Sequence, residues 1–181
     1  MSDLYLPLKA AAEKLDEAEF VRRHGGWYIF CRMPDAQVST LPFVTQLHTI
    51  SADGKLPPEP DKPAPAERIW RVEKSPRNSW RGRISVGRAT NNDIVIRHES
   101  VSKLHAHFTP ATTEPTTGGP PPSYLLTDAG SSNGTEVNDT TLTADVPAPI
   151  RNRDRVAFGL INGRFLDAAT LRSELNSLDW F

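Results

Sequence analysis

The stretch Arg83–Thr109, RISVGRATNNDIVIRHESVSKLHAHFT, decides the fold. Its short runs alternate polar and apolar residues with a period of two, and turn-forming residues such as Asn91-Asn92-Asp93 separate them. This pattern is typical of β-strands joined by tight turns. The stretch therefore predicts three strands, at Arg83–Gly87, Ile94–Arg97 and His105–Thr109.

The same pattern continues on both sides of this stretch. Further strands are predicted at Ile69–Val72, Tyr124–Thr127, Thr135–Val137, Arg155–Phe158 and Arg164–Leu166. Many short strands at this spacing indicate a β-sandwich or barrel. After them, Asp167–Leu178 starts with a capping residue and places Leu171, Leu175 and Leu178 on one helical face, so we expect a closing helix on the sandwich.

Two clusters of proline divide the chain. Five of the sixteen prolines fall in residues 56–66 and five in residues 110–122. The first cluster predicts a linker, and the second a long loop between strands that either extends a recognition surface or only lengthens a connection. The expected organisation is an N-terminal α/β appendage (1–55), a proline-rich linker (56–67), a β-sandwich domain (68–168) and a C-terminal helix (169–181).

The N-terminal appendage is expected to contain two helices and a strand pair. Pro7 can open a helix whose apolar stripe includes Leu8, Ala11, Ala12 and Leu15. A second helix is predicted to start at Asp16, which has capping-box spacing to Glu19, and to stop at Gly25-Gly26. Strands are predicted at Trp27–Cys31 and Val44–Ile50. No residue of this region indicates a function.

Composition excludes several classes of protein. The chain has 181 residues with 38% apolar and 24% charged residues and a formal charge of -1, which argues against a polycationic nucleic-acid binder. A single cysteine, Cys31, excludes a disulfide framework and fits a reducing compartment. No apolar run is long enough to span a membrane and no signal peptide is evident, so we expect a cytoplasmic protein without membrane or nucleic-acid partners.

The charge is unevenly distributed along the chain. Residues 68–109 carry nine basic and three acidic side chains, a local charge of +6 in a nearly neutral molecule. One basic stretch that holds the loops between strands suggests a site for a small anion.

Three of the predicted loops carry donors for such an anion. Arg88 follows one strand, Ser102 and Lys103 precede another, and the loop 128–135, which includes Asn133, is rich in short polar side chains. A phosphate monoester has about -1.5 to -2 charges and three acceptor oxygens, so it requires this mixture of cationic and neutral donors. The three loops can converge, and Arg88, Ser102, Lys103 and Asn133 together then supply the donors that a phosphorylated side chain requires.

In these motifs the chain resembles the forkhead-associated (FHA) family of phosphothreonine-binding domains. Five blocks occur in order over about residues 70–166: Gly87-Arg88, Asn92-Asp93-Ile94-Val95, Val101 to Ala106, Asp128 through Ser132-Asn133-Gly134-Thr135, and Val137-Asn138. The resemblance implies a β-sandwich of about eleven strands that binds phosphothreonine peptides through loops at one end.

The resemblance also implies a role for each matching residue. Arg88 and Ser102 would bind the phosphate, Lys103 would assist, Ser132 would face the phosphothreonine and Asn133 would hold the peptide backbone. Four further positions of the motif would mainly shape the loops: Gly87, His105, Gly134 and Asn138.

The chain departs from the family pattern at two places. Lys103 stands where the family usually has arginine, so the charge is kept and the forked geometry is lost. Asn152-Arg153-Asp154 replaces the usual glycine-aspartate turn.

Other functions remain as alternatives. Ser102, His105 and Asp128 are the residue types of a hydrolase triad, but no strained nucleophile turn surrounds Ser102, so no enzyme is expected. His105 and His107 alternate on a strand and cannot hold one metal, and no metal or cofactor is expected. The favoured function is an adaptor that binds a phosphothreonine protein, such as a Ser/Thr kinase or its substrate. The alternative is a phosphate-independent scaffold or self-association module.

Overall fold

The computed structural model describes residues 4–33, 67–111 and 124–177. The helices are α1 (Tyr5–Lys14), α2 (Glu17–His24) and α3 (Ala168–Asn176). The strands are β1 (Trp27–Arg32), β2 (Glu67–Arg71), β3 (Ile84–Gly87), β4 (Ile94–Val95), β5 (Ala106–Pro110), β6 (Tyr124–Asp128), β7 (Thr135–Val137), β8 (Thr140–Thr141), β9 (Ala148–Ile150), β10 (Arg155–Phe158) and β11 (Ile161–Asp167).

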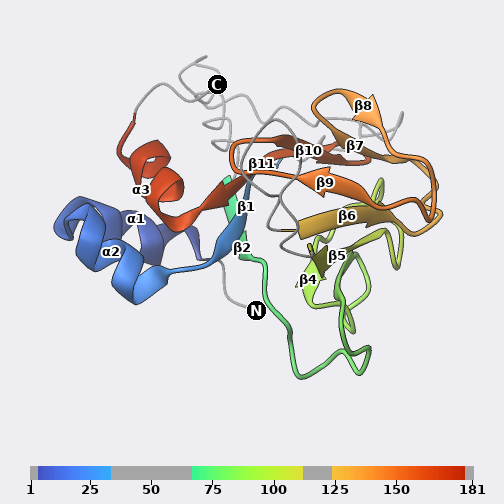
Figure 1. Ribbon diagram of the computed structural model, residues 1–181, viewed down its shortest axis with the longest axis horizontal. Coiled ribbons are helices and arrows are strands. Elements are labelled where there is room, and N and C mark those ends of the chain that lie inside the picture. Colours follow the sequence, from blue (N-terminus) through green and yellow to red (C-terminus); the bar gives the residue numbers. More distant parts are fainter. Residues whose placement is uncertain (1–3, 34–66, 112–123, 178–181) are drawn as a thin grey trace, which may run out of the picture.

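The eleven strands of the described residues form two sheets that pack face to face, with the helices gathered beside β1 and β11 (Figure 1). The six-stranded sheet has the order β2-β1-β11-β10-β7-β8, and the five-stranded sheet has the order β4-β3-β5-β6-β9. Between them lies an apolar core that includes Val86, Ile94, Phe108, Leu126 and Phe165. The predicted β-sandwich is confirmed.

Both faces of β1 are buried. Ile29 and Cys31 belong to the core between the sheets, whereas Tyr28 and Phe30 belong to a second core under the helices. The strand pairs antiparallel with both β11 and β2. A strand that is apolar on both faces needs a cover on each side, which explains why the structure places it inside the six-stranded sheet and not in a separate N-terminal appendage.

The second core joins all three helices to the outer face of this sheet. Its buried members include Leu8, Ala12, Phe20, Leu166, Leu171 and Leu175. The guanidinium of Arg172 on α3 donates to the carbonyl of Leu15 through Nε at 3.0 Å and through Nη2 at 2.7 Å, at the end of α1. The closing helix therefore packs on the sandwich, as predicted, and also on the two N-terminal helices.

The predicted helix starts have the expected caps. The Asp16 carboxylate accepts from the backbone N–H of Glu19 at 2.8 Å, and the Asp167 carboxylate accepts from that of Thr170 at 2.8 Å. Pro7 lies in the first turn of α1, where a missing N–H costs no helical hydrogen bond.

Each of the eight strands predicted after the linker is present: two have the predicted bounds, and the ends of the other six differ by up to three residues. Two further strands, β8 and β9, were not predicted. The predicted strand Val44–Ile50, the proline cluster 56–66 and all but the first two residues of the loop 110–122 lie outside the described residues. Within the described part of the chain, no helix has the length and apolar character needed to span a membrane.

Candidate functional site

Three loops meet at the end of β3, and hydrogen bonds join them. The backbone N–H of Arg88 donates to the carbonyl of Ser102 at 2.9 Å. The backbone N–H of Ser132 donates to Oγ of Ser102 at 3.1 Å, and the two hydroxyl oxygens are 3.5 Å apart. The structure therefore brings together Arg88, Ser102 and Ser132, which the sequence placed on separate loops.

The two cationic side chains of this site are available to a ligand. Arg88 and Lys103 are both exposed, and neither side chain makes a hydrogen bond or an ion pair with any residue that the structure describes. The Ser102 hydroxyl accepts from the backbone N–H of Ser132, and its own proton has only the long 3.5 Å contact to Oγ of Ser132, so the hydroxyl can turn and donate to a ligand. The site thus offers two cations and one hydroxyl donor to an anion.

Gly87 allows the first two loops to approach each other. A Cβ atom at this position would lie 2.3 Å from the carbonyl oxygen of Lys103 and 2.8 Å from Nδ2 of Asn92. The same Lys103 carbonyl accepts from Nδ2 of Asn92 at 2.7 Å and from the backbone N–H of Ala89 at 3.2 Å. Because a side chain would displace this carbonyl, the position requires glycine.

His105 links the second loop to the third. Its Nδ1 accepts from the backbone N–H of Ser102 at 3.0 Å, and its Nε2 lies 2.9 Å from the carbonyl of Gly134. Since Nδ1 is an acceptor, the proton of the neutral ring resides on Nε2 and is donated to Gly134. Burial lowers the pKa of His105, which favours this neutral form.

This arrangement is unlike a hydrolase triad. Both ring nitrogens of His105 bond to backbone groups, so neither accepts the hydroxyl proton of Ser102. The carboxylate of Asp128, the third residue type of a triad, has other partners. In the described part of the chain, no cluster of three or more His, Cys, Asp or Glu residues is placed to hold a metal ion.

Asp128 shapes the third loop. Its carboxylate accepts from the backbone N–H groups of Gly130 and Ser131 at 3.0 and 2.9 Å, and from the hydroxyls of Ser131 and Thr135 at 2.7 and 2.6 Å. Burial by itself would raise the pKa of Asp128, but these hydrogen bonds hold it below its ordinary value. Gly134 adopts a left-handed conformation with φ +79° in this loop.

Asn133 is held by a residue that sequence reasoning missed. Its Nδ2 donates to the carbonyl of Ser100 at 2.8 Å. The Ser100 hydroxyl in turn accepts from the backbone N–H of Leu160 at 3.0 Å and lies 2.8 Å from Nδ1 of His98. Only the backbone of Ser100 contacts Asn133, so no side-chain pattern could reveal the role.

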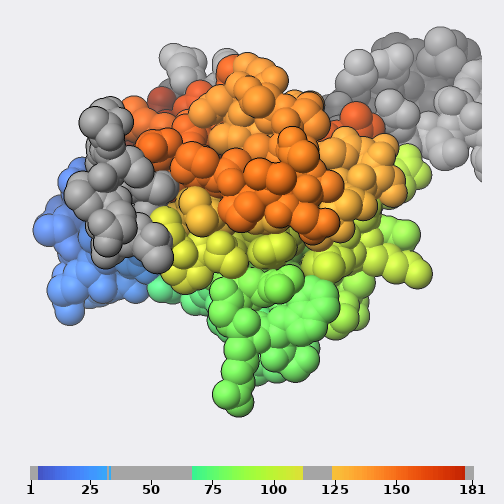
Figure 2. All heavy atoms as spheres, turned by 45° about the vertical axis from the view of Figure 1, so that its right-hand side comes forward, coloured from blue at the N-terminus to red at the C-terminus, as the bar shows by residue number. Residues whose placement is uncertain are grey.

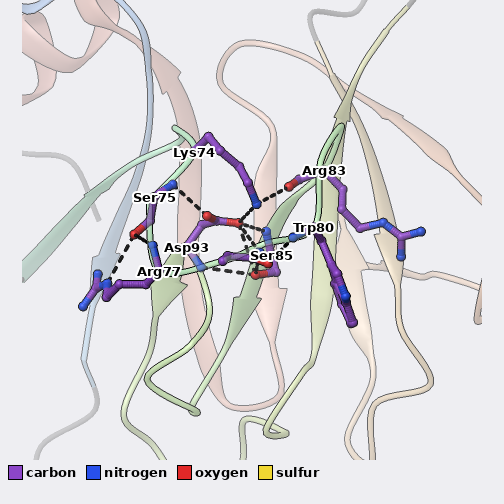
Figure 3. A network of polar contacts seen from close by, with 8 residues as sticks. Lys74, Ser75, Arg77, Trp80, Arg83, Ser85 and Asp93 are labelled. Atoms are coloured by element: carbon purple, nitrogen blue, oxygen red, sulfur yellow. Dashed lines mark hydrogen bonds and ion pairs between the residues drawn. The ribbon is translucent and has the colours of Figure 1, made fainter.

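The buried carboxylate of Asp93 was also missed. It accepts from the backbone N–H groups of Ser75 and Ser85 at 2.7 and 2.8 Å, from Nδ2 of Asn78 at 2.6 Å and from Nζ of Lys74 at 3.1 Å (Figure 3). The sequence signal was an aspartate directly before a strand. Asp93 therefore attaches the segment before β3 to the start of β4.

Asn138 lies away from the three loops and supports a turn. It has φ 49°, its Nδ2 donates to Asp154 at 2.8 Å, and its Oδ1 accepts from the backbone N–H of Arg155 at 2.9 Å. Arg153, in the turn that departs from the family pattern, adopts φ 73°. These residues hold together the β7–β8 and β9–β10 connections.

Comparison with known proteins gives one family. Residues 84–159 match the family model described as the FHA domain. No curated protein sequence matches the chain.

Similar solved structures include three that carry FHA domains or bind phosphopeptides. EmbR of Mycobacterium tuberculosis in complex with a low-affinity phosphopeptide has 20% identity and a TM-score of 0.39, and the alignment covers 57% of this chain and 22% of EmbR. The MEK1 FHA domain in complex with a HOP1 phosphothreonine peptide has 20% identity and a TM-score of 0.42, over 55% of this chain and 88% of that one. The FHA domain of CT664 from Chlamydia trachomatis has 18% identity and a TM-score of 0.42, over 78% and 98%. This chain thus spans about a fifth of the length of EmbR.

Proposed function

We propose that this protein is a non-catalytic adaptor that binds a phosphothreonine on a partner protein and so links Ser/Thr kinase activity to protein assembly; the match of residues 84–159 to the FHA-domain model supports this function. The observation that supports the proposal best is the set of uncommitted donors where the three loops meet. Arg88 and Lys103 are exposed cations without described partners, and the Ser102 hydroxyl has a proton to donate.

The mechanism is a difference in affinity between two states of one threonine. A phosphate brings about two negative charges, and each hydrogen bond to a charged group contributes about 1.5 to 3 kcal/mol. An unmodified hydroxyl offers no such charge, so Arg88 and Lys103 stay hydrated and the binding free energy is small. The site therefore discriminates through the charge it pairs.

Asn133 provides the contact to the peptide backbone in this proposal. Its Nδ2 is occupied by the Ser100 carbonyl, whereas its Oδ1 has no partner among the described residues. An oxygen held in this orientation can accept from a peptide N–H. The Ser100 contact keeps the amide from turning when the ligand is absent.

The test is a titration of the purified protein against degenerate peptide libraries that carry phosphothreonine, phosphoserine or unmodified threonine. Binding should be confined to phosphothreonine, and Arg88→Ala and Ser102→Ala should each weaken it by roughly tenfold or more, since each removes a charge-assisted hydrogen bond. Arg22→Ala, an exposed arginine on α2, is the matched control and should bind normally. Equal binding to the three libraries, or unchanged affinity in both site variants, would contradict the proposal.

Lys103 offers a finer test of the same site. An ammonium is a point charge, whereas a guanidinium can form two parallel hydrogen bonds with a phosphate. We expect Lys103→Arg to tighten phosphopeptide binding a few-fold and Lys103→Gln to weaken it.

A further inference from the structure

A basic loop projects from the sandwich before β3. Residues 74–83, here called the basic loop, form the green projection at the lower edge of the molecule in Figure 2. Trp80 lies in this loop and is 48% exposed, so about half of its indole surface is open to a ligand. Arg81 and Arg83 are exposed beside it.

The basic loop is held firmly at its base. Asp93, which is fully buried, accepts from the backbone of Ser75 and from the side chains of Lys74 and Asn78. Oδ1 of Asn78 then accepts from the backbone N–H of Trp80 at 2.9 Å (Figure 3). A ligand that contacts Trp80 therefore meets a preorganised surface, and less conformational entropy is lost on binding.

Two arginines follow Trp80 within three residues in the chain, and neither has an acidic partner among the described residues. The guanidinium of Arg83 packs over the Trp80 ring at 5.4 Å from its centroid. Arg81 makes no hydrogen bond or ion pair with any described residue, and Arg83 forms no ion pair with one. Arginine and tryptophan dominate the residues that contribute most to protein interfaces.

Three other charged side chains in or beside the basic loop have partners in the structure. Lys74 pairs with Asp93 at 3.1 Å, Glu73 pairs with Arg71 at 3.2 Å, and Nε of Arg77 donates to the hydroxyl of Ser75 at 3.2 Å. Arg81 and Arg83 are the cations that follow Trp80 most closely in the chain. A site with so small a number of cations is better suited to a short acidic segment of a protein than to a nucleic acid. A long polyanion of that kind needs many basic contacts to bind.

The basic loop is rigidly connected to the phosphate site. Nδ2 of Asn92 donates to the carbonyls of Ala89 and Lys103 in the first two loops of the site. The next residue, Asp93, accepts from the backbone N–H of Ser75 at the base of the basic loop. Strand β3 separates the two surfaces, and its four residues span roughly 10 Å at 3.3 Å per residue. A spacer of about four to ten extended residues, at about 3.3 Å each, is long enough to join ligands at both places.

From this geometry we propose that the basic loop is a second docking surface, which binds an acidic segment of the same phosphoprotein that Arg88 and Ser102 capture. The carboxylates pair with Arg81 and Arg83, and an apolar side chain of the segment packs on Trp80. The inference rests on the proposed function, because the phosphothreonine supplies the first contact. Linking two weak contacts raises the overall affinity through effective concentration.

The test uses four peptides and the full chain. One peptide carries phosphothreonine alone, one adds an Asp/Glu-rich segment after a Gly-Ser spacer, one adds an Asn/Gln segment instead, and one has the acidic segment but unmodified threonine. Spacers of about four, seven and ten residues, on either side of the phosphothreonine, cover the expected span. Each peptide is titrated against the wild type and against Arg81→Gln, Arg83→Gln, Arg88→Ala and the matched control Arg22→Gln.

We expect the acidic phosphopeptide to bind about three- to tenfold more tightly than the Asn/Gln one at low salt, because two exposed ion pairs and a partly buried apolar contact are added. The gain should shrink as salt rises, fall in each of Arg81→Gln and Arg83→Gln because one of the two ion pairs is lost, and persist in Arg22→Gln. Phosphothreonine alone should bind the two basic-loop variants normally.

The outcomes separate the two proposals. Equal binding of the acidic and Asn/Gln phosphopeptides at every spacer length overturns the docking surface and leaves the phosphothreonine site intact. Binding of the acidic peptide without any dependence on phosphate or Arg88 overturns the proposed function. Binding of an oligonucleotide or of anionic vesicles that is lost in Arg81→Gln, without a gain for the acidic peptide, assigns the basic loop to another class of anion and contradicts this proposal.

Discussion

Two neighbouring side chains, Asn92 and Asp93, form hydrogen bonds to different loops at one end of the sandwich. Asn92 donates to the carbonyls of Ala89 and Lys103, whereas the Asp93 carboxylate gathers Ser75, Asn78 and other donors on the other side. Both residues are buried and polar, and such groups are tolerated because their hydrogen bonds are made. The stability of the site therefore depends on this pair as well as on the residues that would touch a ligand.

Asp93→Asn is predicted to destabilise the protein by about 2 to 4 kcal/mol, because an amide nitrogen would face donors that now share a buried carboxylate. The free energy of unfolding from urea denaturation measures the effect. Lys74→Gln removes only the partly exposed partner and should cost less. A loss of stability in Lys74→Gln as large as that in Asp93→Asn would show that the ion pair, and not the set of hydrogen bonds, stabilises the loop.

Stability is also predicted to depend on pH through His105. Burial lowers the pKa of this ring in the folded protein, so the unfolded chain binds more protons once the pH falls below about 6.5. The stabilisation is therefore complete above that pH and is lost as the pH falls through the folded pKa. His105→Asn should be less stable at neutral pH, and its free energy of unfolding should fall less between pH 7 and 5 than that of the wild type.

His24 and His107 contribute to the same pH dependence, because burial lowers the pKa of each. His107→Gln is the matched control for an altered histidine outside the three loops. A pH slope in His105→Asn that equals the wild-type slope would contradict the assignment to His105.

At the scale of elements, the ends of β3 and β5 determine where the loops meet. Gly87 ends β3, and the absence of a side chain there lets the Lys103 carbonyl approach. The strand that precedes the site is buried at every position, so it cannot move outward to relieve a clash.

Gly87→Ala is predicted to destabilise the protein by about 3 kcal/mol or more and to weaken phosphopeptide binding, because the new Cβ would overlap the Lys103 carbonyl and no side-chain rotation relieves it. Thermal unfolding and peptide titration measure the two effects. Gly82→Ala is the control: no atom lies within 4 Å of its Cβ position, and its φ of +81° costs about 1 to 2 kcal/mol in strain alone. Equal effects of the two substitutions would show that backbone strain, and not the close approach, matters at Gly87.

The strands that the sequence revealed are those with a repeating pattern. Strands such as β3 and β10 carry apolar residues that enter the core, so their apolar runs can be recognised in the sequence. The two missed strands, β8 and β9, are short edge strands: one contains only Thr140 and Thr141, and the other is interrupted by Pro149. An edge strand needs neither a regular alternation nor a full set of N–H donors, so its sequence resembles a loop.

The sequence predicted those residues of the candidate site whose side chains belong to recognisable motifs. Arg88, Ser102 and Ser132 belong to ordered motifs, and the structure places them together. Ser100 was not predictable, because it acts through its carbonyl on Asn133 and through its hydroxyl on Leu160, sixty positions away along the chain. Hydrogen bonds of this kind depend on the finished fold and leave no local pattern.

At the scale of the whole molecule, the six-stranded sheet separates two apolar cores, and the helices cover its outer face at β2, β1 and β11. The helices on its outer face are joined to it through Tyr28, Phe30 and Leu166. The N-terminal helices and the β-sandwich therefore share one structural unit, because β1 contributes side chains to both cores.

Phe20→Ala, on α2 and fully buried in the second core, is predicted to cost about 3 to 5 kcal/mol. Because the cores share β1, unfolding should remain a single transition at a lower midpoint when it is followed by far-UV circular dichroism and by loss of phosphopeptide binding. Val21→Ala, at an exposed site on the same helix, should change the midpoint little. Two separate transitions in Phe20→Ala would show that the helices and the sandwich unfold independently.

The pairing of β1 with β11 has a consequence for biosynthesis. Trp27, near the start of the chain, lies opposite Asp167, close to the C-terminal helix. A pairing between residues so far apart in sequence closes late and makes folding slow, since the loop entropy must be overcome first. During translation, β1 therefore leaves the ribosome long before β11 does, and until β11 is made β1 has only β2 as a partner, with apolar side chains on both of its faces. Such a strand is a segment of the nascent chain that a chaperone can protect, and the rate at which β11 is synthesised limits how soon the six-stranded sheet can close.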